Sequence, residues 1–206
     1  MKIISDLEQN SPEWIEFRRG KVTGSKLKDL VVKRGTGRKI GFYQLIADKL
    51  GIPADDESPM DRGHRLEDEA VKFFESETGK KVTRAGFCVS DFSDSIALSP
   101  DGLIGEGNAF TEALEIKCLG SARHIQAVIE NEIPEEYMLQ ALQYFVVIEE
   151  LQTLHFAFYD PRMVARPYHC VDLRRQDVAE DVGKYRQYQL DTLEEIDRIV
   201  SELEFN

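Results

Sequence analysis

The stretches Ser-Pro-Asp-Gly-Leu at residues 99–103 and Leu-Glu-Ile-Lys-Cys at residues 114–118 decide the fold of this chain. The Asp-Gly pair follows an apolar stretch and predicts a tight turn, which places the carboxylate of Asp101 at the end of a strand. Glu115 and Lys117 are separated by one residue in an apolar, strand-like segment. Both side chains therefore point to the same face of that strand, and the residue between them points to the other.

A hairpin through the glycine-containing segment 102–108 is expected to bring Asp101 beside Glu115. Two neighbouring carboxylates repel each other unless a hard cation lies between them, and Mg²⁺ prefers a few oxygen ligands together with water. The ammonium of Lys117 supplies positive charge where a phosphate oxyanion develops, or holds the attacking water. We therefore expect metal-assisted phosphodiester hydrolysis. The alternative is a solvated Glu-x-Lys charge pair on an exposed strand, and the apolar flanking residues argue against it.

The composition is that of a globular protein, with 206 residues of which 42% are hydrophobic and 31% charged. We expect one domain over residues 1–206. The first ten residues do not resemble a signal peptide and the longest apolar run is too short to span a bilayer, so a cytoplasmic protein is expected.

The chain has three cysteines, an odd number, and they are widely spaced: Cys88, Cys118 and Cys170. This spacing predicts free thiols in a reducing compartment, not disulfides or a zinc site.

Charge is distributed unevenly along the chain. The net charge is −12, yet the segment 18–39 has nine basic residues and one acidic residue, Asp29. A basic stripe on an acidic body is typical of a protein that contacts phosphates along one surface. The alternative is an ordinary solvated helix with lysines on its outer face.

Apolar periodicity and turn residues predict an alternation of helices and strands. The expected helices cover residues 11–20, 23–35, 42–50, 58–79, 121–130, 134–148 and 176–203. The expected strands cover residues 81–89, 95–99, 110–118, 151–159 and 167–173. This order predicts an α/β fold with a central mixed sheet flanked by helices.

Other residues are candidates for the same chemistry. Glu67 lies at the edge of the apolar face of helix 58–79, where it is either a third carboxylate at the metal site or a surface acid. Arg18 ends the first helix and Ser25 lies at the start of the second, which together predict a pocket for a terminal phosphate. Plain N-capping is the alternative for Ser25. Tyr137 and Gln140 share one helix face and can approach the scissile phosphate or a base, or serve in ordinary packing.

The histidines carry less information. His64 lies one helical turn before Asp68. It is a candidate metal ligand, but we favour its interpretation as a surface residue. The spacing of the remaining histidines offers no partners, so no role is assigned to His124, His155 or His169.

These motifs, in this order, resemble the phage lambda exonuclease family, also called the YqaJ-like viral recombinases, within the PD-(D/E)xK nuclease superfamily. The resemblance covers nearly the whole chain. Its motifs are Trp14, Phe17-Arg18, residues 22–25, Gly63, residues 67–70, 99–103, 114–118, 137–140 and Tyr-Asp-Pro-Arg-Met at residues 159–163.

The resemblance implies a restriction-endonuclease-like core with an N-terminal helical elaboration. It also implies a Mg²⁺-dependent exonuclease, with Mn²⁺ as a substitute, that degrades one strand of linear double-stranded DNA from 5′ to 3′. The product is a 3′ single-stranded tail for phage-type recombination. The implied assembly is a toroidal homotrimer around DNA, with a single-strand annealing protein as partner and a phage or prophage origin in a bacterial host.

The resemblance also implies residue roles. Asp101, Glu115 and the carbonyl of Ile116 would be metal ligands, Lys117 the catalytic lysine and Glu67 an accessory acid. Arg18 and Ser25 correspond to positions that hold the 5′-phosphate, and Gln140 corresponds to an active-site helix residue. The segment between Gln140 and Tyr144 is one residue longer than the family pattern, which leaves Gln143 as an alternative to Gln140.

Two alternatives to this function remain open from sequence. One is a nuclease of the same superfamily with another polarity or an endonuclease habit, although an iron–sulfur nuclease of the Cas4 kind would need four thiolate ligands and this chain has three cysteines. The other is a non-catalytic DNA-binding module, against which the complete set of Asp101, Glu115 and Lys117 argues.

Overall fold

The computed structural model describes residues 4, 8, 10–32, 37–53, 57–107 and 109–204. Its helices are α1 (Pro12–Arg18), α2 (Gly24–Leu27), α3 (Ile40–Lys49), α4 (Pro59–Thr78), α5 (Ser121–Glu130), α6 (Glu135–Val147) and α7 (Arg175–Glu204). Its strands are β1 (Cys88–Ser90), β2 (Ser93–Leu98), β3 (Gly102–Glu106), β4 (Ala109–Lys117), β5 (Thr153–Tyr159) and β6 (Tyr168–Arg174). The predicted α/β class with a mixed sheet is confirmed.

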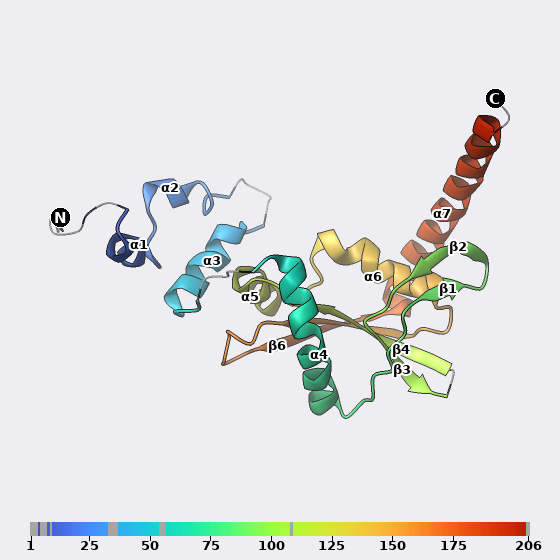
Figure 1. Cartoon of the computed structure of the whole chain (residues 1–206), viewed down its shortest axis with the longest axis horizontal. Helices are drawn as coiled ribbons and strands as arrows, with labels where there is room; N and C mark the ends of the chain where they lie inside the picture. The colour runs from blue at the N-terminus through green and yellow to red at the C-terminus, as the bar shows by residue number, and fades with distance from the viewer. Residues whose placement is uncertain are drawn as a thin grey trace.

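The central sheet has the strand order β3-β4-β5-β6 (Figure 1). Strands β3 and β4 form an antiparallel hairpin, β4 and β5 run parallel, and β6 pairs antiparallel with β5. A parallel pair needs a crossover connection, and α5 and α6 supply it between β4 and β5. Strands β1 and β2 form a separate antiparallel pair that packs against α6.

Helices cover both faces of the sheet, and the alternation of side chains along β4 divides the core in two. Leu114 and Ile116 point to the face covered by α4, where they pack with Leu66 and Phe74. The opposite face packs against α6 and α7. Because Glu115 lies between Leu114 and Ile116 in sequence, its side chain points to the α6 side, into the larger core.

The N-terminal helices extend from one end of the sheet domain, and the distal part of α7 projects from the other end (Figure 1). Helix α3 packs on α5 through a small apolar cluster that includes Tyr43 and Ile125. Helices α1 and α2 are joined to α3 by polar contacts. Lys26 forms a 3.0 Å ion pair with Asp48, and the guanidinium of Arg19 donates to the carbonyl of Ile52.

Two predicted elements are shorter in the structure than expected. Among its described residues, the predicted helix 23–35 is helical only over Gly24–Leu27, and its residues 33–35 lie outside the described ranges. Leu27 and Val31 are 51% and 57% exposed, so no packed face stabilises a longer helix. The predicted strand 81–89 is reduced to one isolated bridge at Thr83 and the short strand β1.

The expected hairpin is present, but part of its predicted turn is a strand. Residues 102–106 form β3, and the chain turns at Gly107, whose φ is +63°. Gly102 belongs to the strand because it pairs with Leu114 of β4, and Val82 packs closely against it. A Cβ atom at Gly102 would lie 2.2 Å from Cγ1 of Val82. Asn108 of the predicted turn lies outside the described residues.

Among the described residues, no helix has both the length and the apolar character needed to cross a membrane. The cysteines Cys88, Cys118 and Cys170 are all free thiols, as predicted.

Candidate active site

The β3–β4 hairpin brings Asp101 and Glu115 together at one end of the sheet. Gly102 pairs with Leu114 across the two strands, so the residue before β3 lies next to the residue that follows Leu114. Oδ2 of Asp101 accepts a hydrogen bond from the backbone N–H of Ile116 at 2.7 Å. This contact anchors the Asp101 side chain to the same segment of β4 that carries Glu115.

Glu115 is a buried carboxylate, 2% exposed, with several hydrogen-bond donors. Its Oε1 accepts from Nζ of Lys117 at 2.7 Å and from Nε2 of Gln140 at 2.6 Å. Its Oε2 accepts from the hydroxyl of Tyr144. A buried carboxylate is costly unless charges and donors compensate it, and these three groups do so. The 2.7 Å contact also shows that Glu115 and Lys117 share one face of β4, as the sequence predicts.

The two carboxylates influence each other electrostatically. Burial raises the pKa of Asp101 to about 7, and the negative charge of Glu115 adds to the rise. The hydrogen bond from Ile116 and the charge of Lys117 act in the opposite direction but are outweighed. The two carboxylates repel each other when both are ionised. A divalent cation bound between them would offset this repulsion, so the pair suits such an ion.

Lys117 and Tyr137 lie next to each other at this site. Nζ of Lys117 is 5.2 Å from the ring centroid of Tyr137, within the range of a cation–π contact. Tyr137 and Gln140 are on the same face of α6, as predicted, and both are directed toward the β4 charges.

Glu67 is connected to Asp101 through an arginine. The guanidinium of Arg84 donates to Oε1 of Glu67 and, at 2.9 Å, to the backbone carbonyl of Asp101. Its other terminal nitrogen donates to Oδ1 of Asp68 at 2.6 Å. The charge of Glu67 also contributes to the raised pKa of Asp101, so this third carboxylate is close enough to act on the pair.

The structure distinguishes the two glutamines of α6. Gln140 donates to Glu115, whereas Nε2 of Gln143 donates to the carbonyl of Ala97 at 3.2 Å and to Oε1 of Gln189 at 3.0 Å. Gln140 is therefore the glutamine that contacts the candidate site, through Glu115, and Gln143 links α6 to β2 and α7.

Arg18 and Ser25 contact each other on helices α1 and α2, which extend from one end of the sheet domain (Figure 1). Nη2 of Arg18 donates to Oγ of Ser25 at 2.9 Å and to Oγ1 of Thr23 at 3.2 Å. The guanidinium also stacks over Trp14, 4.1 Å from the ring centroid. The N-cap of α2 is Thr23, so Ser25 lies inside the first turn and is not the cap.

Two residues of the site have no role in the sequence-based prediction. Tyr144 is 1% exposed, donates to Glu115 and accepts a 3.3 Å hydrogen bond from the backbone N–H of Asp101. Its spacing of four from Gln140 on one helix is the signal that could have identified it. Arg84 lies outside any strand or helix, and nothing in the local pattern indicates its contacts. His64 is exposed, in line with the surface interpretation.

The fold and the site together define a class. A mixed sheet flanked by helices, with two carboxylates and a lysine at the paired ends of β3 and β4, is the architecture of the restriction-endonuclease-like PD-(D/E)xK core. More particularly, the chain belongs to the YqaJ-like viral recombinase domain family, whose model matches residues 13–150.

Solved structures agree with this assignment. The chain is similar to the crystal structure of an alkaline exonuclease, LHK-Exo, from Laribacter hongkongensis, with 26% identity and a TM-score of 0.55 over 94% of this chain and 100% of that one. The structure of LHK-Exo in complex with dAMP matches with the same identity and coverage and a TM-score of 0.56. No curated protein matches the chain significantly.

Proposed function

We propose that this protein is a divalent-metal-dependent exonuclease that degrades one strand of linear double-stranded DNA from 5′ to 3′ and leaves a 3′ single-stranded tail. The observation that carries the proposal is the convergence of Asp101, Glu115 and Lys117 at the β3–β4 hairpin. The family assignment and the similarity to an alkaline exonuclease support a nuclease. The dAMP complex of that exonuclease is consistent with a site that accepts a deoxynucleotide.

Asp101, Glu115 and the carbonyl of Ile116 would hold Mg²⁺, with Mn²⁺ as a substitute. A bound ion of this kind would supply Lewis acidity at the scissile phosphate. Lys117 orients the attacking water and offsets the negative charge that develops on the phosphate. Gln140 and Tyr144 hold the Glu115 carboxylate in one orientation, and Glu67 acts through Arg84 as the accessory acid at the edge of the site. Tyr137 lies over Lys117, where it can contact the DNA strand.

End recognition is assigned to Arg18 and Ser25. The guanidinium and hydroxyl lie 2.9 Å apart, so both can bind one phosphate group. In this proposal the 5′-phosphate contacts Arg18 and Ser25 and sets the polarity of degradation. Basic residues around them, including Lys21 and Lys28, extend the contact along the phosphate backbone.

A ring-shaped homotrimer would hold this acidic protein on DNA. Exposed apolar side chains on α1 and on the segment between α1 and α2 support association with another subunit, because Ile15 is 61%, Phe17 44% and Val22 57% exposed. Head-to-tail contacts that close a ring would place the basic segment of each subunit toward the enclosed DNA.

In a bacterial host the protein would act in the cytoplasm as a single domain over residues 1–206. A single-strand annealing protein would take over the 3′ tail, in keeping with a phage or prophage origin.

The experiment that tests the function uses linear duplex DNA labelled at either the 5′ or the 3′ end, with Mg²⁺ or with EDTA. We expect mononucleotide release from the 5′ end only with Mg²⁺, and no cleavage of closed circular DNA. Release from the 3′ end would assign another polarity, and cleavage of circles would assign an endonuclease. Asp101→Asn should abolish release, whereas the exposed Asp91→Asn should not. DNA binding without hydrolysis by the wild-type protein would indicate a non-catalytic module.

A further inference from the structure

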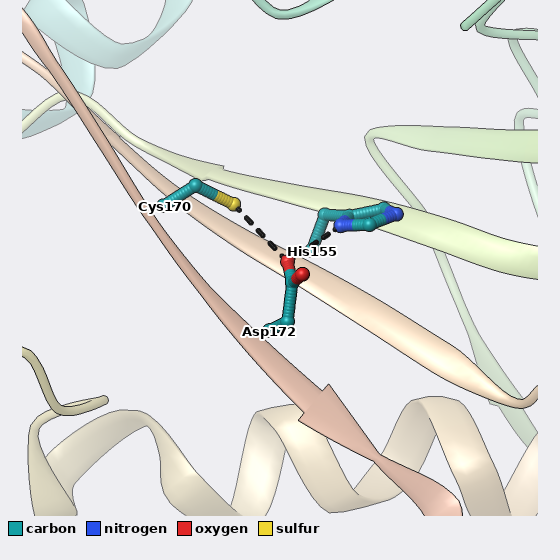
Figure 2. Close-up of side chains that lie close together, drawn as sticks. All are labelled: His155, Cys170 and Asp172. Atoms are coloured by element: carbon teal, nitrogen blue, oxygen red, sulfur yellow. Dashed lines mark hydrogen bonds and ion pairs between the residues drawn. The ribbon is translucent and has the colours of Figure 1, made fainter. Parts of the chain in front are cut away.

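A second cluster of chemically active side chains lies outside the active site, on strands β5 and β6 (Figure 2). His155 is paired directly with Asp172 across the two strands, and Ala157 is paired with Cys170. Because side chains alternate, His155, Cys170 and Asp172 all point to the face of the sheet that α4 covers. His155 packs against Phe74 of α4, with 5.3 Å between the ring centroids. Glu115 points to the opposite face.

The ligand atoms of these three side chains converge. Nδ1 of His155 is 2.7 Å from Oδ1 of Asp172, and Sγ of Cys170 is 3.7 Å from the same oxygen. Figure 2 shows both contacts meeting at the Asp172 carboxylate. All three ligand atoms lie within 4.8 Å of one another. Bonds of about 2.0–2.3 Å to one tetrahedral ion put its ligand atoms roughly 3.5 Å apart, so small side-chain rotations suffice.

The second ring nitrogen of His155, Nε2, contacts a carboxylate, as the second nitrogen of a metal-binding histidine commonly does. Nε2 is 2.5 Å from Oε2 of Glu112, which also binds the ammonium of Lys80. When Nε2 carries the proton and its N–H donates a hydrogen bond to Glu112, the lone pair of Nδ1 is available to an ion that Asp172 also binds. Such a carboxylate behind a histidine fixes the tautomer and the ring orientation of a metal ligand.

We propose that His155, Cys170 and Asp172 bind a transition-metal ion of the Zn²⁺ type, with water in the fourth position. A donor set of one nitrogen, one sulfur and one oxygen suits Zn²⁺ and does not suit Mg²⁺, which prefers oxygen ligands. Asp172 is exposed, with 53% of its side-chain area accessible, whereas His155 is buried, so an ion can enter from the Asp172 side. The site is independent of the proposed nuclease chemistry.

Two features limit the affinity of this site. The ammonium of Lys80 is 3.2 Å from Nε2 of His155, and its positive charge repels a metal ion bound to this ring. Glu112 contacts the same ammonium and offsets part of its positive charge. Burial raises the pKa of the Cys170 thiol to about 12, so an ion must displace the thiol proton. The carboxylates of Asp172 and Glu112 favour the ion, and a bound ion would cross-link β5 to the edge strand β6.

The test is a titration of the full-length protein with Co²⁺, followed by the thiolate-to-cobalt absorption in the near ultraviolet. Oxygen ligands such as Asp101 and Glu115 do not produce this absorption, so the readout separates the two sites. We expect one Co²⁺ per chain with a thiolate band, and displacement by stoichiometric Zn²⁺. The band should persist in Cys88→Ser, which changes another half-buried cysteine, and should be lost in Cys170→Ser.

Two further variants test how much each carboxylate contributes to metal affinity. Glu112→Gln should weaken binding by roughly 10–100-fold and keep the band, because this carboxylate only orients the ring. Asp172→Asn should weaken binding further, and because this residue is exposed the variant is expected to fold even if Cys170→Ser does not. Absence of a thiolate band in the wild-type protein would overturn the proposal. Retention of the band in Cys170→Ser, or unchanged affinity in Asp172→Asn, would also overturn it. Loss of the Zn²⁺ site with intact nuclease activity would leave the proposed function unaffected.

Discussion

The phenol of Tyr144 donates a hydrogen bond to Oε2 of Glu115 and accepts one from the backbone N–H of Asp101. A single buried hydroxyl on α6 therefore contacts both of the acidic residues that the β3–β4 hairpin brings together. Burial, together with the negative charge of Glu115, raises the pKa of Tyr144, so this hydroxyl keeps its proton and remains a donor. Tyr144 acts as a positioning residue for the carboxylates.

Removal of this hydroxyl should affect both stability and turnover. In Tyr144→Phe, Oε2 of Glu115 loses a donor in a buried environment, which costs about 1–3 kcal/mol of unfolding free energy. We expect kcat to fall more than DNA affinity, because DNA-binding groups on the N-terminal helices are unchanged. Urea denaturation and nuclease kinetics measure the two effects. The control is Tyr188→Phe, which changes a tyrosine that is 66% exposed. Equal losses in the two variants would argue against the positioning role.

The two glutamines of α6 form a matched pair for mutation. Gln140→Ala removes a donor to Glu115 and should lower activity by roughly 10–100-fold. Gln143→Ala removes contacts to Ala97 and Gln189, and should lower stability with little change in kcat. Initial rates on linear duplex DNA, together with melting temperatures, separate the two variants. The reverse pattern would show that Gln143, not Gln140, serves the chemistry.

The raised pKa of Asp101 has a consequence for stability that depends on pH. The folded state binds this proton more tightly than the unfolded state, for which the pKa is 3.8, so the contribution of Asp101 to stability falls as pH rises from about 4 to about 7. Asp101→Asn removes this dependence. In EDTA, the stability of the variant relative to the wild type should increase by about 2–3 kcal/mol between about pH 5 and about pH 8.

Added Mg²⁺ should stabilise the wild-type protein at about pH 8 and leave Asp101→Asn nearly unchanged, because a ligand that binds the folded state raises its stability. Urea denaturation at one fixed protein concentration measures both comparisons. A relative stability of Asp101→Asn that falls with pH would contradict the electrostatic interpretation of the carboxylate pair.

The contact between Arg18 and Ser25 predicts a preference for phosphorylated ends. DNA with a 5′-phosphate should be degraded faster than DNA with a 5′-hydroxyl, and Arg18→Ala should remove most of the difference. Loss of one charge-assisted contact costs roughly 1.5–3 kcal/mol, or about 10–150-fold in rate. Lys28→Ala is the control, since it removes an exposed charge from the same basic segment and should slow degradation of both DNAs equally, which leaves the preference for the 5′-phosphate intact. Equal rates of the wild-type protein on both ends would exclude the proposed phosphate contact.

The ring proposal predicts a trimer in solution and processive degradation. Light scattering at micromolar concentration should give three times the 23.6 kDa mass of one chain. Once degradation has begun, excess competitor DNA should not stop it, because an enclosed duplex is retained by topology. Ile15→Glu, which charges a side chain that is 61% exposed, should reduce both the mass and the processivity. A monomeric mass with distributive degradation would refute the ring and leave the nuclease proposal standing.

Local patterns in the sequence were sufficient for much of the fold. The N-caps Ser11 and Ser58, each followed by proline, start α1 and α4 where predicted, and the apolar period of residues 121–130 coincides with α5. The prediction was wrong where stability depends on distant contacts. Residues 28–32 leave the helix, and the side chains of Val31 and Val32 there are exposed, so little packing favours a longer helix. Gly102 lies in a strand because it pairs with Leu114 of β4, and Val82, from outside the sheet, packs so closely against it that a Cβ atom would not fit.

The sequence by itself determined that Glu115 and Lys117 share a face, because the two-residue period of a strand is a local property, and it placed Asp101 next to them through a short hairpin. Only the tertiary structure decided that Gln140 and Tyr144 reach Glu115, and that His155, Cys170 and Asp172 converge on another face. Those contacts depend on how α6 packs on the sheet and on the register between β5 and β6. Register and packing are set by the whole core, so spacing along the chain does not reveal them.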